Sequence, residues 1–193
     1  MLFFVIMKNS LSKKIIFTSL FSAFICAGCF IQIPLGTGVP IVIQDMMAML
    51  SGLILGPLWG SISVLIFLIL GCIGLPVFSG KAGIQIILYG PTGGFLIGYL
   101  VGALVGGLIL YFSCKKERES NAWEWIWTTI AAIAATVVVF ILGIIGFHRV
   151  LPDKDFNQIL AAVLIPFIPG NLIKLAIMIP LSKKIRNLLK VHF

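Results

Sequence analysis

Long apolar runs divide the chain into segments of the right length to cross a lipid bilayer. A membrane-spanning helix needs about 20 apolar residues, with a working range of about 17 to 25. Three runs meet this requirement without interruption, namely 15–33, 95–112 and 126–147. The pattern therefore predicts an all-α integral membrane protein.

Two shorter apolar runs, 41–55 and 58–73, lie on either side of Gly56-Pro57. Glycine and proline together mark a turn, so we expect a hairpin of two short helices. Short helices suit a compact bundle with an internal cavity, because loop covered by protein can replace a missing helical turn at membrane depth.

The last apolar run, 159–181, is long enough to cross the membrane but has an irregular sequence. It contains Pro166, Pro169, Gly170 and Lys174. Proline removes a backbone donor from a helix interior, so this span must be broken or must start again midway.

Residues 74–94 are the least helical part of the membrane region, with six glycines and two prolines. We interpret them as a structured loop whose apolar stretch 84–89 dips back toward the bundle. The chain is then a single membrane domain, 1–193, with six transmembrane helices, a structured loop between helices 3 and 4, and tails at 1–14 and 182–193.

Basic residues predict the orientation of these six spans. Of the fourteen lysines and arginines, ten fall in the two tails and in the loop between the fourth and fifth spans, and only three fall in the loops of the other side. The positive-inside rule then places both termini in the cytoplasm of a multi-pass protein in the bacterial cytoplasmic (inner) membrane. The same bias accounts for the net charge of +8 without nucleic acid.

Composition agrees with a lipid environment and argues against an enzyme. The chain is 60% hydrophobic and 10% charged, with a mean hydropathy of +1.17. His148 and His192 lie at span ends, and no nucleophile–base pair or metal-ligand cluster falls inside a helix. We therefore expect no catalytic residues, no metal and no cofactor.

The segment 90–94 lacks the Gly-Lys-Ser/Thr ending of a phosphate-binding loop. The chain is therefore not expected to hydrolyse ATP by itself.

Asp45 and Lys174 are the only ionisable residues inside the apolar spans. Lys183, the next cation after Lys174, is about 13 Å further along a helix, so Lys174 is too deep to reach the interface easily. A buried ammonium needs a partner, and its default interpretation is functional. The alternative is a purely structural pair with Asp45.

Asn171 follows Pro169-Gly170 at the expected helix re-start, where asparagine is a favoured N-cap. It lies three residues before Lys174, so both side chains share one face. An amide, a cation and the positive end of a half-helix suit the binding of a polar or anionic ligand. The structural alternative is that Asn171 only caps the helix and binds no ligand.

Further polar candidates lie in the second span and in the loop. Gln44 and Asp45 are adjacent and point about 100° apart on a helix, so we do not expect both to line one cavity. The loop contributes Ser79, Lys81, Tyr89 and Thr92.

Small residues recur along the first span at Ser19, Ala23 and Ala27. Such a stripe allows close approach of another helix. The partner helix can belong to the same bundle or to another subunit, and the stripe alone does not decide between the two.

Five motifs occur in register along the chain. They are Ile41-Val42-Ile43-Gln44, LILGPLWG from Leu53 to Gly60, Leu70-Gly71 with Gly74-Leu75-Pro76-Val77-Phe78, Gly90-Pro91-Thr92-Gly93-Gly94-Phe95, and Ile168-Pro169-Gly170-Asn171 with Lys174. Together they resemble BioY, the family of biotin-binding S-components of energy-coupling-factor (ECF) vitamin transporters. The resemblance implies high-affinity capture of biotin from outside. It also implies partners, namely a transmembrane coupling protein and two ABC ATPase subunits that use ATP to power uptake.

The resemblance also implies roles for particular residues. Lys174 matches the family lysine that holds the ureido ring, but Asn171 replaces the family acid, and we hypothesise that Asp45 supplies the missing counter-charge while Asn171 accepts a ureido N–H. Phe78 and Tyr89 are expected against the apolar part of biotin, and Lys81 at its carboxylate. Ser19, Ala23 and Ala27 match the stripe that faces the coupling protein.

Two other functions are compatible with the sequence. The change at Asn171 is compatible with an S-component for a related cargo, such as lipoate, dethiobiotin or another vitamin. A stand-alone proton-coupled vitamin transporter is also compatible, because Asp45 and Lys174 could relay a proton. Transporters of that kind usually contain paired repeats, and the sequence shows none.

Overall fold

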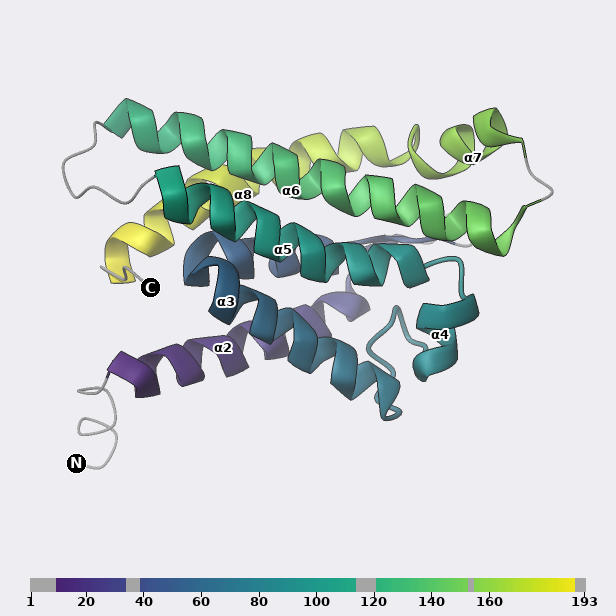
Figure 1. Ribbon diagram of the computed structural model, residues 1–193, viewed down its shortest axis with the longest axis horizontal. Coiled ribbons are helices and arrows are strands. Elements are labelled where there is room, and N and C mark those ends of the chain that lie inside the picture. The colour runs from purple at the N-terminus through teal and green to yellow at the C-terminus, as the bar shows by residue number, and fades with distance from the viewer. Residues whose placement is uncertain (1–9, 34–38, 114–120, 153–154, 190–193) are drawn as a thin grey trace.

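The computed structural model describes residues 10–33, 39–113, 121–152 and 155–189, which form an elongated bundle of helices (Figure 1). The elements in chain order are α2 (Ser10–Ala27), η1 (Gly28–Phe30), β1 (Gln32–Ile33), β2 (Ile41–Val42), α3 (Gln44–Cys72), α4 (Ile84–Tyr89), α5 (Gly93–Ser113), α6 (Asn121–Val150), α7 (Phe156–Val163) and α8 (Phe167–Leu189).

Four segments of the described chain are long and apolar enough to cross a membrane, namely Leu11–Phe30, α3, α5 and α6. The helical membrane architecture expected from the apolar runs is therefore present. The helices begin and end differently from those runs, because strand pairing and helix packing set their ends.

Helix α3 consists of two halves that fold back on each other at Gly56-Pro57. Gly56 has φ 79° and ψ 179°, a conformation that only glycine adopts easily. The halves are in backbone contact, since a Cβ on Gly60 would lie 2.5 Å from the Cα of Gly52. The Ser51 hydroxyl also donates to the Gly60 carbonyl at 3.0 Å. The structure therefore contains the hairpin that the sequence predicts at Gly56-Pro57.

The connection into α3 differs from the expected second span. Ile41–Val42 is a strand, β2, which pairs antiparallel with β1 in the register Gln32 to Val42 and Ile33 to Ile41. Helix α3 therefore begins at Gln44 rather than at 41, and the first helical segment ends near Phe30 rather than at 33. Two residues per strand are too short a signal to separate from a helical apolar run.

The expected break in the last span lies between α7 and α8, around Pro166. Helix α8 restarts at Phe167, so Pro169 and Gly170 belong to its first turn and the prediction that Asn171 caps the helix is wrong. Proline is tolerated there, because the first N–H groups of a helix have no acceptor inside the helix.

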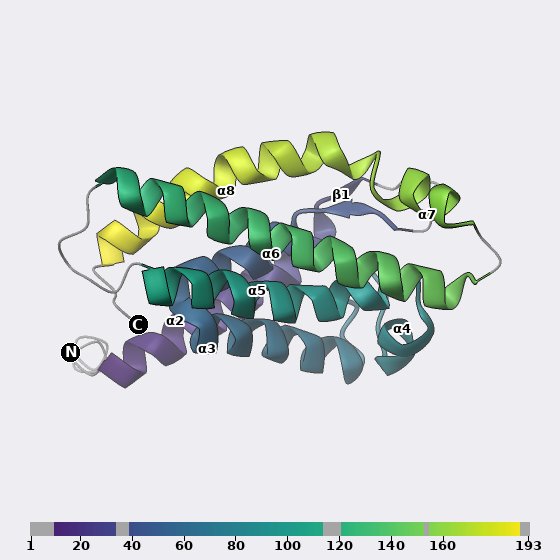
Figure 2. The ribbon, with the colours of Figure 1, turned by 45° about the horizontal axis from the view of Figure 1, so that its top comes forward.

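The expected tails are partly helical. Helix α2 begins at Ser10 and α8 extends to Leu189, so residues 10–14 and 182–189 continue the helices. The rest of both tails lies outside the described residues. In Figures 1 and 2 the start of α2 and the end of α8 lie at one end of the bundle, and α4 and α7 lie at the other.

Glycines allow α3, α5 and α6 to pack backbone to backbone. A Cβ on Gly52 would lie 2.1 Å from the Ala103 carbonyl oxygen, and one on Gly94 would lie 2.8 Å from the Gly146 Cα. Helix α2 packs on α3, and α8 packs on both α3 and α6. This close packing fixes the relative positions of the helix ends that surround the pocket described below.

We expect Gly52→Ala to lower stability by about 2 kcal/mol or more, because the added methyl group overlaps the backbone of α5. Gly170→Ala is the matched control, since its Cβ would meet only ordinary contacts, the nearest at 3.6 Å. The measurement is thermal unfolding in detergent. Equal unfolding temperatures for the two variants would contradict the packing.

Candidate functional site

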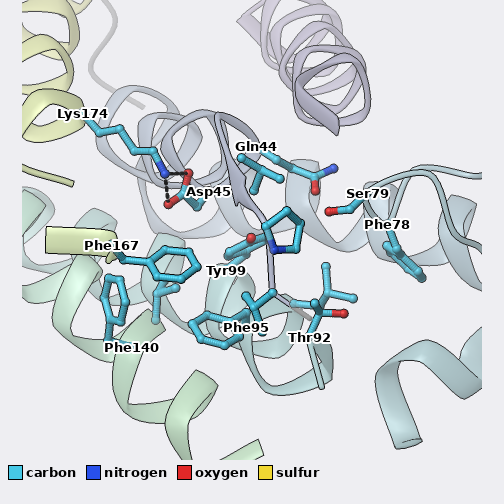
Figure 3. Close-up of a pocket in the computed structure, with 15 residues that line it drawn as sticks. Gln44, Asp45, Phe78, Ser79, Thr92, Phe95, Tyr99, Phe140, Phe167 and Lys174 are labelled. Atoms are coloured by element: carbon cyan, nitrogen blue, oxygen red, sulfur yellow. Dashed lines mark hydrogen bonds and ion pairs between the residues drawn. The ribbon is translucent and has the colours of Figure 1, made fainter. Parts of the chain in front are cut away.

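A pocket lies in the half of the bundle that carries α4 and α7, where the first turns of α3 and α5 and the first eight residues of α8 meet residues 139–140 of α6 (Figure 3). Its empty volume is about 480 Å³, the space at its mouth included. Polar and aromatic side chains line it together with a few aliphatic ones. The polar set is Gln44, Asp45, Ser79, Thr92, Tyr99 and Lys174, and the phenylalanines are Phe78, Phe95, Phe140 and Phe167.

Asp45 and Lys174 form an ion pair in the wall of this pocket. The Lys174 Nζ lies 2.8 Å from Oδ1 and 2.7 Å from Oδ2 of Asp45, and each residue is only 8% exposed. Asp45 Oδ1 also accepts the Met46 backbone N–H at 2.7 Å. Two of the three ammonium protons are thereby used, which leaves one for a ligand acceptor.

The pair joins the start of α3 to the second turn of α8, two segments that are 129 residues apart in the chain. The pairing that the sequence offered as a hypothesis is thus present in the structure. A carboxylate and an ammonium side by side present both an acceptor and a donor to one molecule.

Gln44 lines the same pocket as Asp45, so the expectation that they would not share a cavity is wrong. Gln44 is 1% exposed, and its Nε2 donates to the carbonyls of Ile25 at 3.0 Å and Val77 at 2.8 Å. Both residues are at the tip of α3, where the pocket lies over the helix end. Two side chains that point in different directions around a helix axis can both border a cavity that lies over the end of that helix.

Three phenylalanines from three helices form one wall of the pocket. Phe95 of α5 and Phe167 of α8 stack with ring centres 6.5 Å apart and planes 15° apart. Phe140 of α6 meets both rings edge-on, each at 6.1 Å. Such contacts are favourable arrangements of aromatic rings and keep an apolar surface rigid.

Sequence reasoning did not identify this aromatic wall or Tyr99. Tyr99 is 6% exposed and follows Phe95 by one helical turn on α5. The i, i+4 spacing of two aromatic residues was the available signal. No sequence signal distinguished Phe140 and Phe167, because apolar residues surround them in the sequence.

The turn after α3 contributes Phe78 and Ser79. Phe78 and Lys81 exchange backbone hydrogen bonds of 2.9 and 3.0 Å across a tight turn in which Ser79 has φ 52° and Gly80 has φ 82°. The Phe78 ring is buried against Phe67, with ring centres 5.4 Å apart. This anchoring directs Ser79 toward the pocket.

Three of the predicted site residues do not line the pocket. Lys81 and Tyr89 are exposed, the latter by 75%, and Tyr89 ends the short helix α4, in which no residue is buried. Asn171 is buried, and its Nδ2 donates to the Phe167 carbonyl at 2.8 Å. Its Oδ1 is buried without a hydrogen-bond partner in the described structure.

The small residues of the first span lie on the outer face of α2. Ser19, Ala23 and Ala27 are exposed, whereas Thr18, Ser22 and Ile25 face the bundle. The stripe is therefore not used for packing against the described helices of this chain.

No three histidine, cysteine, aspartate or glutamate side chains gather into a metal site within the described ranges. What the pocket offers is a charged pair, several hydroxyl and amide groups, and an aromatic wall. These groups suit a small molecule with a polar head and an apolar body.

Fold and pocket together define a multi-pass helical membrane protein with a ligand pocket between its helices. The model of the BioY family matches residues 6–191, and the chain belongs to this family. The resemblance seen in the five sequence motifs is thereby confirmed.

Curated relatives and a solved structure match over most of the chain. The biotin transporter BioY of Rhodobacter capsulatus is 38% identical over 176 residues, which cover 86% of this chain and 90% of the relative. The biotin transporter BioY of Thermotoga maritima is 31% identical, with 91% and 97% covered. A crystal structure at 2.1 Å of the S-component for biotin from an ECF-type ABC transporter matches with a TM-score of 0.82, at 32% identity and with 93% of each chain covered.

We predict strong energetic coupling between Asp45 and Lys174. Asp45→Asn or Lys174→Met alone leaves a buried charge without its partner and should lower stability by about 3 kcal/mol. The double variant should recover most of this loss, because no charge is left unpaired. Unfolding of all four proteins in detergent gives the coupling energy, and additive losses would show that the pair is not coupled.

Proposed function

We propose that this protein is the S-component of an ECF-type ABC transporter, which captures biotin from outside the cell for ATP-driven uptake. The observation that carries the proposal is the buried Asp45–Lys174 pair beside an aromatic wall. The family match and the relatives described as biotin transporters support it.

The pocket has complementary groups for each part of biotin. The third proton of the Lys174 ammonium is available to the ureido carbonyl, and the Asp45 oxygens can accept a ureido N–H. The thiophane ring and the valeryl chain can lie along Phe95, Phe140 and Phe167.

Residues at the mouth would hold the biotin carboxylate and complete the site. The hydroxyl groups of Ser79 and Thr92 line the pocket and can donate to it. Lys81 lies two residues from Ser79 and supplies the positive charge on that turn. Tyr89 is exposed at the end of α4, outside the pocket. Asn171 is proposed as a second acceptor for a ureido N–H, since its Oδ1 has no partner in the described structure. Its side chain does not line the pocket, so this role requires the amide to turn toward the ligand.

Orientation in the membrane would place the pocket on the outer side. We propose six spans with both termini in the cytoplasm, counting the two halves of α3 separately and α7 with α8 as the last span. The pocket is in the half of the bundle opposite the start of α2 and the end of α8. A pocket in that half is accessible to a molecule arriving from outside.

The energy for release would come from partner subunits. The chain has no phosphate-binding loop, so we propose that ATP is used by two ABC ATPase subunits that act through a transmembrane coupling protein. The exposed stripe of Ser19, Ala23 and Ala27 is the proposed contact with the coupling protein. Small side chains there let a partner helix approach closely.

Biotin binding by Asp45→Asn and Lys174→Met tests the ligand assignment. Each variant loses a charged hydrogen-bond partner, so we expect affinity to fall about 10- to 100-fold. Isothermal titration in detergent measures this, with near-unchanged size-exclusion profiles as the control for folding. Full affinity in both variants would exclude the proposed role of the pair.

The co-purified ligand identifies the cargo directly. We expect mass spectrometry of the purified wild-type protein to detect biotin. Dethiobiotin, lipoate or another vitamin in its place would indicate an S-component for a different cargo. Absence of any ligand, with uptake that depends on a proton gradient and not on the ATPase subunits, would indicate a stand-alone transporter.

The stripe on α2 yields a separate prediction. Ala23→Leu should abolish co-purification with the coupling protein and leave biotin affinity unchanged, because a bulky side chain keeps the partner helix away. Ala176→Leu is the matched control, since Ala176 is exposed on the outer face of α8. Loss of the complex in both variants would argue against a specific contact at the stripe.

A further inference from the structure

A second pocket lies at the opposite end of the bundle, between the start of α6 and the end of α8. Its empty volume is about 730 Å³ with its open mouth included. Its lining includes Asn121 and Trp125 of α6 and Lys183, Lys184 and Asn187 of α8. The biotin site described above uses none of these residues.

Lys183 is a buried cation in the lining of this pocket. It is only 7% exposed, and its ammonium donates to the Asn121 carbonyl at 3.1 Å and to the Asn121 side-chain oxygen. Its Nζ also lies 3.7 Å from Glu124 Oε2 and 4.8 Å from the centre of the Trp125 ring. These contacts hold the two helix ends together and keep a positive charge at the base of the pocket.

Lys184 and Asn187 are the exposed polar groups of the pocket. Neither has a hydrogen-bond or ion-pair partner among the described residues. Lys183 and Lys184 contribute two positive charges and Glu124 contributes one negative charge, which leaves a net charge of +1 beside two groups with free N–H donors. This arrangement complements a singly charged anion with several acceptor oxygens.

The depth of the pocket indicates where the anion would come from. Helix α8 changes at this point from the apolar stretch 175–181 to the polar sequence Ser182-Lys183-Lys184. Trp125, which is 40% exposed, and Leu188, which is 73% exposed, border the same space. Tryptophan and lysine at the end of an apolar span lie at the level of the lipid headgroups.

We propose that this pocket binds the phosphate of an anionic phospholipid from the leaflet on the side of the chain termini. Lys184 and Asn187 donate to the phosphate oxygens, and Lys183 contributes charge from below. The glycerol and acyl chains lie against Trp125, Pro180 and Leu188. Basic pockets between membrane helices are known lipid headgroup sites.

Lipid competition measured by native mass spectrometry tests the site. The full chain is released from nanodiscs containing equal amounts of phosphatidylglycerol and phosphatidylcholine with identical acyl chains, and bound lipids are counted. We expect the wild-type protein to retain phosphatidylglycerol preferentially. Lys184→Gln should weaken this retention about fivefold, and Lys184→Gln/Asn187→Ala should weaken it further.

Lys13→Gln is the matched control, because it removes one exposed lysine from α2 at the same end of the bundle. It should leave retention unchanged. Equal retention in wild type and Lys184→Gln, or equal loss in Lys13→Gln, would overturn the site. Displacement of the lipid by millimolar inorganic phosphate would also overturn the proposal, since the pocket would then bind free phosphate.

Discussion

The ion pair between Asp45 and Lys174 is the interaction on which the pocket depends. Moving either charge out of water is costly, and only a partner at close range offsets the cost. The two contacts of 2.7 and 2.8 Å provide this, and the Met46 N–H satisfies a further lone pair of the carboxylate. The requirement to pair the charges holds the start of α3 against α8 and sets one wall of the pocket.

The geometry around the pair comes from close packing of α3, α5 and α6. Folding back at Gly56 places the first half of α3 inside the bundle, and Gly52 and Gly60 let its halves touch. The tip of α3 then stands at the pocket, where Gln44 binds the carbonyls of Ile25 and Val77. The short first half of α3 therefore places a polar helix end inside the bundle, where its backbone groups are covered by protein.

The two ends of the molecule use lysine in different ways. Lys174 is paired with a carboxylate inside the bundle and retains one proton for a ligand. Lys183 is buried among Asn121, Glu124 and Trp125 and holds the start of α6 to the end of α8. A hydropathy pattern shows only that both residues are charged. The residues that surround each lysine in the folded chain determine what it can bind.

Sequence patterns alone predict the helical membrane class, the turn at Gly56-Pro57, the break in the last span and the two buried charges. These features follow from apolar length, from the backbone limits of glycine and proline, and from the cost of a charge in lipid. The folded structure is needed to show that Asp45 pairs with Lys174, that Gln44 shares their pocket, and that Phe95, Phe140 and Phe167 form one wall. It also shows that α8 begins before Pro169 and that Lys81 and Tyr89 lie outside the pocket. These features depend on contacts between segments far apart in the chain, and local sequence patterns hold no information on which distant helix faces which.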